Sequence, residues 1–160
     1  MTSNIFTFGT LVDDEVIASL LGVVPRNFYA TLDGQAVYRG TFEQLPTLVR
    51  QRLTHVDPNT FKFLFVKPKA ASSQVAGRLY QVTPAQEKIL DQWELFPDWY
   101  RKRTVTVTTA DGASHEAFLY TLDCDGEELT DFTRVPNDRE FTLDRARRTR
   151  ARVLRKLPNT

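Results

Sequence analysis

The chain has 160 residues, of which 41% are hydrophobic and 26% charged, and its formal net charge at pH 7 is +1. This length predicts one domain with its own core, and the single Cys124 cannot form an internal disulfide. No apolar run is long enough to cross a bilayer, and the N-terminus has no signal-peptide pattern. These features argue against a membrane protein and favour a cytoplasmic one.

The N-terminal stretch predicts a strand, a glycine turn and a helix. Apolar and polar residues alternate over residues 4–8, and the aspartate pair that follows can cap a helix ending at Leu21. The N–H groups of Gly9, Thr10 and Leu11 would then have no ladder partner, so they are candidates for binding a carboxylate or an oxyanion. Alternatively, the glycine serves only the backbone of the corner.

The next segment predicts strands on either side of a helix. Residues 27–42 have the pattern of two strands joined at Asp33-Gly34 by a type I′ hairpin turn. Pro46 and the helical spacing of apolar residues up to Leu53 predict a helix, and the apolar run over residues 61–66 predicts another strand.

The strongest local signals lie between Gly77 and Val107. Residues 75–82 alternate as a half-buried strand does, and Thr83-Pro84-Ala85-Gln86 combines an N-cap, a first-turn proline and a capping-box glutamine. Apolar residues at helical spacing then predict a helix that ends before Pro97.

Glu94 lies in the last turn of this predicted helix. The helix C-terminus carries partial negative charge, and the aromatic side chains of Trp93, Phe96, Trp99 and Tyr100 can exclude water, so we expect a raised pKa. Such a carboxylate suits proton transfer near neutral pH. The ordinary alternative is a solvent-facing glutamate at a frayed helix end.

The last part of the chain predicts a hairpin at Asp111-Gly112 and then a basic helix from Asp138 onward. About six strands with helices inserted among them favour an α+β domain with a curled sheet. Residues 136–160 contain eight Lys or Arg and three Asp or Glu, so this segment carries +5 and the remainder of the chain −4. We expect residues 136–160 to form an extension packed on a domain of residues 1–135, rather than to bind nucleic acid, because aromatic residues for base stacking are missing beyond Phe141.

Several short motifs together resemble the γ-glutamylcyclotransferase-like family, with the AIG2-like and γ-glutamylamine cyclotransferase branch as the closest. In chain order they are Phe8-Gly9-Thr10-Leu11, Gly77-Arg78-Leu79-Tyr80, Leu90-Asp91-Gln92-Trp93-Glu94, Tyr100 with its trailing basic residues and TVTV, and Ala117-Phe118-Leu119-Tyr120. The resemblance covers about residues 4–122 and implies a small mixed β-barrel with flanking helices. Phe8 and Leu95 stand where the family usually has Tyr and Gly.

The resemblance implies an enzyme that cyclises a γ-glutamyl amide to 5-oxoproline and releases an amine. Glu94 would be the general acid/base, and no metal or organic cofactor is implied. The implied substrate-binding residues are Phe8, Gly9, Thr10, Leu11, Tyr100 and Tyr120. The expected partner is a small γ-glutamyl compound, with no membrane. A domain of the same fold that binds a small ligand or a protein without turnover is the alternative, because fold does not fix function.

Overall fold

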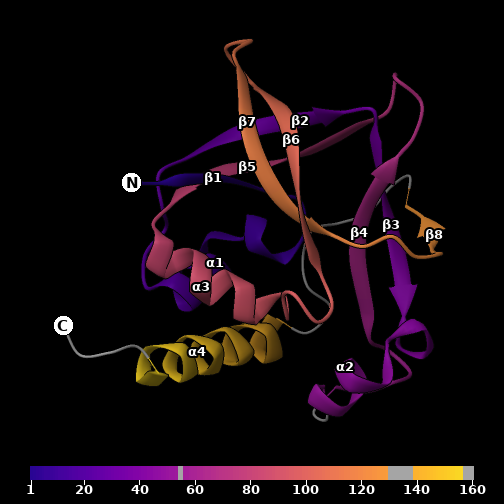
Figure 1. The fold of residues 1–160 in the computed structure, drawn as a ribbon, viewed down its shortest axis with the longest axis vertical. Helices are drawn as coiled ribbons and strands as arrows, with labels where there is room; N and C mark the ends of the chain where they lie inside the picture. The colour runs from indigo at the N-terminus through magenta and orange to yellow at the C-terminus, as the bar shows by residue number, and fades with distance from the viewer. Residues whose placement is uncertain (54–55, 130–138, 157–160) are drawn as a thin grey trace.

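A closed barrel of five strands forms the centre of the molecule (Figure 1). The computed structural model describes residues 1–53, 56–129 and 139–156. Going around the barrel, the strands are β1 (Ser3–Thr7), β5 (Gln74–Val82), β2 (Asn27–Asp33), β6 (Arg101–Thr109) and β7 (Ser114–Thr121). Neighbouring strands are antiparallel except at the closure, where β1 meets β7 in parallel. The predicted α+β class with a small mixed barrel is confirmed.

A second sheet of three strands lies beside the barrel. Its order is β4 (Lys62–Pro68), β3 (Gln35–Thr41) and β8 (Glu127–Glu128). The Thr121 hydroxyl on β7 bridges to Val66 on β4, accepting from its N–H at 3.1 Å and donating to its carbonyl at 2.7 Å. Val37 and Val66 pack in the same buried cluster as the barrel side chains. The second sheet is therefore fixed against the barrel.

The hairpin predicted at Asp33-Gly34 is wrong. Strand β2 pairs with β5 and β6 in the barrel, whereas β3 pairs with β4 and β8 in the second sheet. Gly34 does adopt the left-handed conformation, with φ of 77°, but its N–H and carbonyl bond to Ser73 and Lys69. Sequence reasoning found the turn and missed that the chain changes sheet there. The hairpin at Asp111-Gly112 is confirmed by the antiparallel pairing of β6 and β7.

Helices α1 (Asp14–Leu21), α3 (Pro84–Trp93) and α4 (Arg139–Lys156) lie together at one end of the barrel, with α4 outermost (Figure 1). Helix α2 (Thr47–Arg52) lies apart from them, at the end of the second sheet. The short 3-10 turns η1 (Thr10–Val12) and η2 (Phe42–Gln44) precede α1 and α2. Among the described residues, no helix combines the length and the apolarity needed to cross a membrane.

The basic helix predicted from Asp138 onward is present as α4 and packs on α1 and α3. Its buried residues are Leu143, Ala146, Thr149 and Val153. Arg139 at its start pairs with Asp13, at 3.1 Å, and with Glu15, at 2.7 Å, so part of its positive charge meets acids of the body. Positions 136–138 and 157–160 of the predicted extension lie outside the described residues.

The contact between β1 and β5 requires Gly77. A methyl group at this position would lie 2.1 Å from the Thr7 carbonyl oxygen and 2.7 Å from Phe6 Cζ. Because a strand backbone cannot yield as a flexible side chain can, we expect Gly77→Ala to lower the unfolding free energy by at least about 2 kcal/mol. Chemical denaturation measures this loss. Gly9→Ala is the matched control, because its methyl group would meet only Leu64 Cδ1, at 3.8 Å; equal losses in the two variants would contradict the packing argument.

Candidate active site

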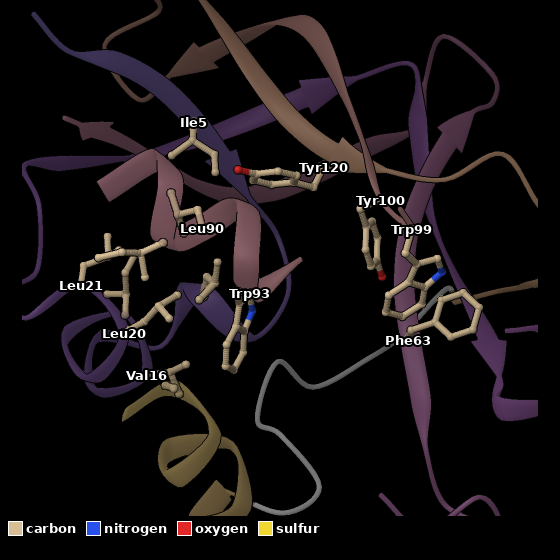
Figure 2. Packing of buried hydrophobic residues seen from close by; sticks show 14 of the residues in the cluster. Ile5, Val16, Leu20, Leu21, Phe63, Leu90, Trp93, Trp99, Tyr100 and Tyr120 are labelled. Carbon is tan, nitrogen blue, oxygen red and sulfur yellow. The ribbon is translucent and has the colours of Figure 1, made fainter. Parts of the chain in front are cut away.

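A cavity of about 170 Å³ opens between the end of β1, helices α3 and α4, and strand β4. Figure 2 shows Trp93 on one side of this region, Trp99 and Tyr100 on the opposite side, and Tyr120 nearby on β7. The residues that line the cavity include every predicted catalytic or substrate-binding residue, namely Phe8, Gly9, Thr10, Leu11, Glu94, Tyr100 and Tyr120. The motifs are therefore brought together by the fold although they lie up to 112 residues apart in the chain.

The turn from Gly9 to Leu11 is held from outside the cavity by β5. Tyr80 donates its hydroxyl to the Leu11 carbonyl at 3.0 Å, and Arg78 forms an ion pair with Asp14 at the start of α1. None of the turn and loop hydrogen bonds between backbone groups of the described residues is donated by the N–H of Gly9, Thr10 or Leu11. The motif Gly77-Arg78-Leu79-Tyr80 thus fixes the turn that forms this part of the cavity wall.

Helix α3 places Glu94 through caps at both of its ends. The predicted capping box is confirmed, because the Thr83 N–H donates to Gln86 Oε1 at 2.9 Å and the Gln86 N–H donates to Thr83 Oγ1 at 3.2 Å. At the other end, the N–H of Phe96 bonds to the Asp91 carbonyl at 2.9 Å and that of Leu95 to the Gln92 carbonyl at 3.3 Å, which is a Schellman motif.

Leu95 occupies the position of this motif that needs a left-handed residue. Its φ is 53°, a conformation that costs an ordinary L-residue roughly 1 to 2 kcal/mol and costs glycine almost nothing. Leu95 recovers part of this cost by packing against the main core cluster. The leucine at a position where the family usually has glycine therefore leaves the helix end, and with it Glu94 at the C-cap, in the regular geometry.

The carboxyl group of Glu94 has an unusual electrostatic environment. Burial raises its pKa to about 7, while the positive charge of Arg145 opposes that rise. The side chain is only partly accessible, through the cavity that it lines. A carboxyl group with this pKa can both accept and return a proton at neutral pH.

The two tyrosines on the cavity wall have their hydroxyls engaged by the protein. Tyr100 donates to the Leu64 carbonyl at 2.7 Å, and Tyr120 donates to Asp91 Oδ1 at 2.6 Å. Burial raises the pKa of both hydroxyls. They are therefore neutral wall residues at physiological pH.

Not all of the aromatic residues expected around Glu94 are found there. Trp93, Trp99 and Tyr100 line the cavity, but Phe96 does not. Its ring lies edge-on to Tyr120, with the centroids 6.3 Å apart, and under the ammonium of Lys102, at 4.5 Å. The chain reverses at Leu95, which turns Phe96 away from the carboxylate.

Arg145 on α4 was missed by sequence reasoning. Its guanidinium lies 4.0 Å from the centre of the Trp93 ring, donates to the Trp93 carbonyl at 2.8 Å and lines the cavity together with Glu94. No local pattern distinguishes Arg145, because it is one of seven arginines in α4 and lies 51 residues after Glu94 in the chain. Within the described residues, no group of three or more His, Cys, Asp or Glu side chains is arranged to hold a metal ion.

Comparison with known proteins gives one family. A family model described as gamma-glutamyl cyclotransferase, AIG2-like, matches residues 5–139. A solved gamma-glutamyl cyclotransferase superimposes with a TM-score of 0.65 at 14% identity, covering 80% of this chain and 70% of its own. A glutathione-specific gamma-glutamyl cyclotransferase from yeast superimposes with a TM-score of 0.55 at 11% identity, covering 99% of this chain and 89% of its own. An AIG2-like protein from Mus musculus superimposes with a TM-score of 0.51 at 18% identity, covering 76% of this chain and 78% of its own. At these identities the likeness establishes the fold. No curated protein matches the chain in sequence.

Proposed function

Because the chain belongs to the AIG2-like gamma-glutamyl cyclotransferase family, we propose that it cyclises a γ-glutamyl amide to 5-oxoproline and releases the amine. The observation that carries this proposal is that one cavity is lined both by a carboxyl group whose pKa is about 7 and by a turn whose N–H groups donate none of the turn and loop hydrogen bonds between backbone groups of the described residues. Proton transfer and orientation are what the reaction needs most.

The proposed reaction is an intramolecular aminolysis. The α-amino nitrogen of the substrate attacks its own γ-carbonyl carbon, a C–N bond closes the five-membered ring, and the bond to the leaving nitrogen breaks. Glu94 takes one proton from the α-ammonium before the attack and returns it to the leaving nitrogen. The ring nitrogen loses its second excess proton as the C–N bond to the leaving nitrogen breaks, and the departing amine takes up this proton, so that the products are 5-oxoproline and an alkylammonium ion and the proton count balances. The N–H groups of Gly9, Thr10 and Leu11 hold the α-carboxylate, which keeps the chain folded for the attack.

The direct test is release of 5-oxoproline from γ-glutamyl compounds by the purified protein, measured by chromatography with mass detection. We expect turnover without added metal or cofactor. Binding of these compounds without any release of 5-oxoproline would instead favour a non-catalytic domain of the same fold. Phe8 supports that alternative, because it lacks the hydroxyl of the tyrosine that the family usually has at this position, and it packs among the barrel side chains.

Gly9 and Thr10 allow a test of the backbone turn. A side chain at Gly9 would project toward Leu64, another residue of the cavity wall, without a close contact in the fold. We therefore expect Gly9→Val to raise KM at least tenfold while the unfolding free energy changes by less than about 1 kcal/mol. Thr10→Ala should cost no more than one ordinary hydrogen bond, about 0.5 to 1.5 kcal/mol of binding. Wild-type kinetics in Gly9→Val would show that the turn has only a structural role and does not bind the substrate.

A further inference from the structure

The cavity has an excess of positive charge around Glu94. Its charged lining residues are Glu94, Arg145 and Lys62. When Glu94 is ionised, the two cations and one carboxylate give this wall a net charge of +1, and when Glu94 is protonated the net charge is +2. A γ-glutamyl derivative of a simple amine is a zwitterion with no net charge, whereas a γ-glutamyl amino acid carries one further carboxylate. The charge of the wall matches the second kind of compound.

Arg145 is the cation best placed to meet that carboxylate. Its contact with the Trp93 carbonyl uses only one of the five N–H donors of a guanidinium, and the Trp93 ring fixes the group in place. It forms no ion pair within 4.0 Å with a carboxylate of the described residues. A guanidinium that lines a cavity in this state is preorganised to bind a carboxylate with two parallel hydrogen bonds.

We expect the leaving amine to be the part of the substrate nearest to Arg145. In the proposed reaction Glu94 must reach the leaving nitrogen, and Arg145 is bound to the residue next to Glu94. In an α-amino acid the carboxylate is one carbon away from that nitrogen, so a leaving group held at Glu94 brings its carboxylate toward the guanidinium. The glutamyl α-carboxylate, by contrast, is assigned to the turn at Gly9 to Leu11.

We propose that Arg145 is a specificity-determining residue that selects γ-glutamyl compounds whose leaving amine bears a carboxylate. This inference rests on the proposed function. Arg145 lies on helix α4, beyond residues 5–139, the segment that matches the family model. Lys62 extends the positive wall on the side of β4.

The test compares γ-glutamylalanine with γ-glutamylethylamide, which differs only by the missing carboxylate. We expect the wild-type protein to prefer γ-glutamylalanine by roughly ten- to hundredfold in kcat/KM, the range of a charge-assisted contact. Arg145→Met should reduce this preference to within about threefold, and Arg145→Lys should retain most of it. Arg147→Met, at an exposed position of the same helix, is the control and should keep the full preference.

The outcomes separate the two proposals. No 5-oxoproline from either compound would overturn the proposed function and this inference with it. Equal turnover of both compounds by the wild type would overturn the inference alone, and this measurement does not depend on whether any variant folds. If Arg145→Met slows both substrates equally, Arg145 is a structural clamp on α3 or a ligand of the glutamyl carboxylate, and the inference is wrong.

Discussion

Glu94→Gln is expected to reduce kcat for 5-oxoproline release by about two to four powers of ten. Glutamine keeps the shape of the side chain but cannot accept a proton from the α-ammonium or return one to the leaving nitrogen. Because the lost interaction belongs to proton transfer and not to ground-state binding, kcat should fall while KM stays within a few-fold of the wild type. Initial rates of 5-oxoproline formation over a range of substrate concentrations measure both constants.

Glu87→Gln is the matched control for this variant. Glu87 lies on the same helix and pairs with Lys102 at 3.3 Å, but it does not line the cavity. The same chemical change should therefore leave kcat within about twofold, as expected for a partly exposed ion pair. A Glu94→Gln protein that turns over γ-glutamyl substrates at the wild-type rate would remove Glu94 from the mechanism.

Much of the fold follows from local sequence rules, because each of these rules concerns contacts between near neighbours. Thr83-Pro84-Ala85-Gln86 predicts the start of α3, and Pro97 predicts that the helix ends before it, which places Glu94 at the helix end. The apolar residues of α1 are buried as their helical spacing predicts. In both elements the N-cap side chain accepts hydrogen bonds from N–H groups two or three residues further on, and the helical spacing of apolar residues sets which face is buried.

The same local rules could not predict which strands pair over long distances in the chain. The residues Asp33-Gly34 fit a hairpin turn equally well whether the flanking strands pair with each other or leave for two different sheets. Which strands pair is decided by competition among all strands for partners, and here β5 pairs with β2 along its full length. A local pattern has no information on that competition.

The candidate site divides in the same way. The resemblance pointed to Glu94 and the Gly9 turn because their motifs have recognisable residues, and the cavity brings these residues together. Arg145 has no such signature, since its position depends on how α4 docks on α1 and α3. One arginine among several in a basic helix can be distinguished only by its contacts, here the ring and the carbonyl of Trp93.

The pH dependence of the reaction should have its acidic limb near pH 7. Burial raises the pKa of Glu94 to about 7, and only the anion can accept the proton of the α-ammonium. Below this pH, kcat/KM should fall about tenfold per pH unit, so that roughly one hundredth remains at pH 5. The carboxylates of the substrate titrate near pH 3.5 and do not contribute to this limb. A midpoint near 4.5, the ordinary value for glutamate, would show that the carboxylate is fully solvated.

The same group should make stability depend on pH in the absence of any substrate. The folded pKa of Glu94 is raised above the ordinary value of 4.5, so the folded protein binds the proton more tightly than the unfolded chain does. The resulting stabilisation is fully present below pH 4.5 and is lost as the pH rises through 7. The unfolding free energy of the wild type relative to Glu94→Gln should therefore fall by at most about 3 kcal/mol between pH 4 and pH 8, less to the extent that water in the cavity screens the charge. Denaturation curves of the two proteins at both pH values measure this difference, and a difference that is constant with pH would exclude a raised pKa even if the activity profile had its midpoint at 7.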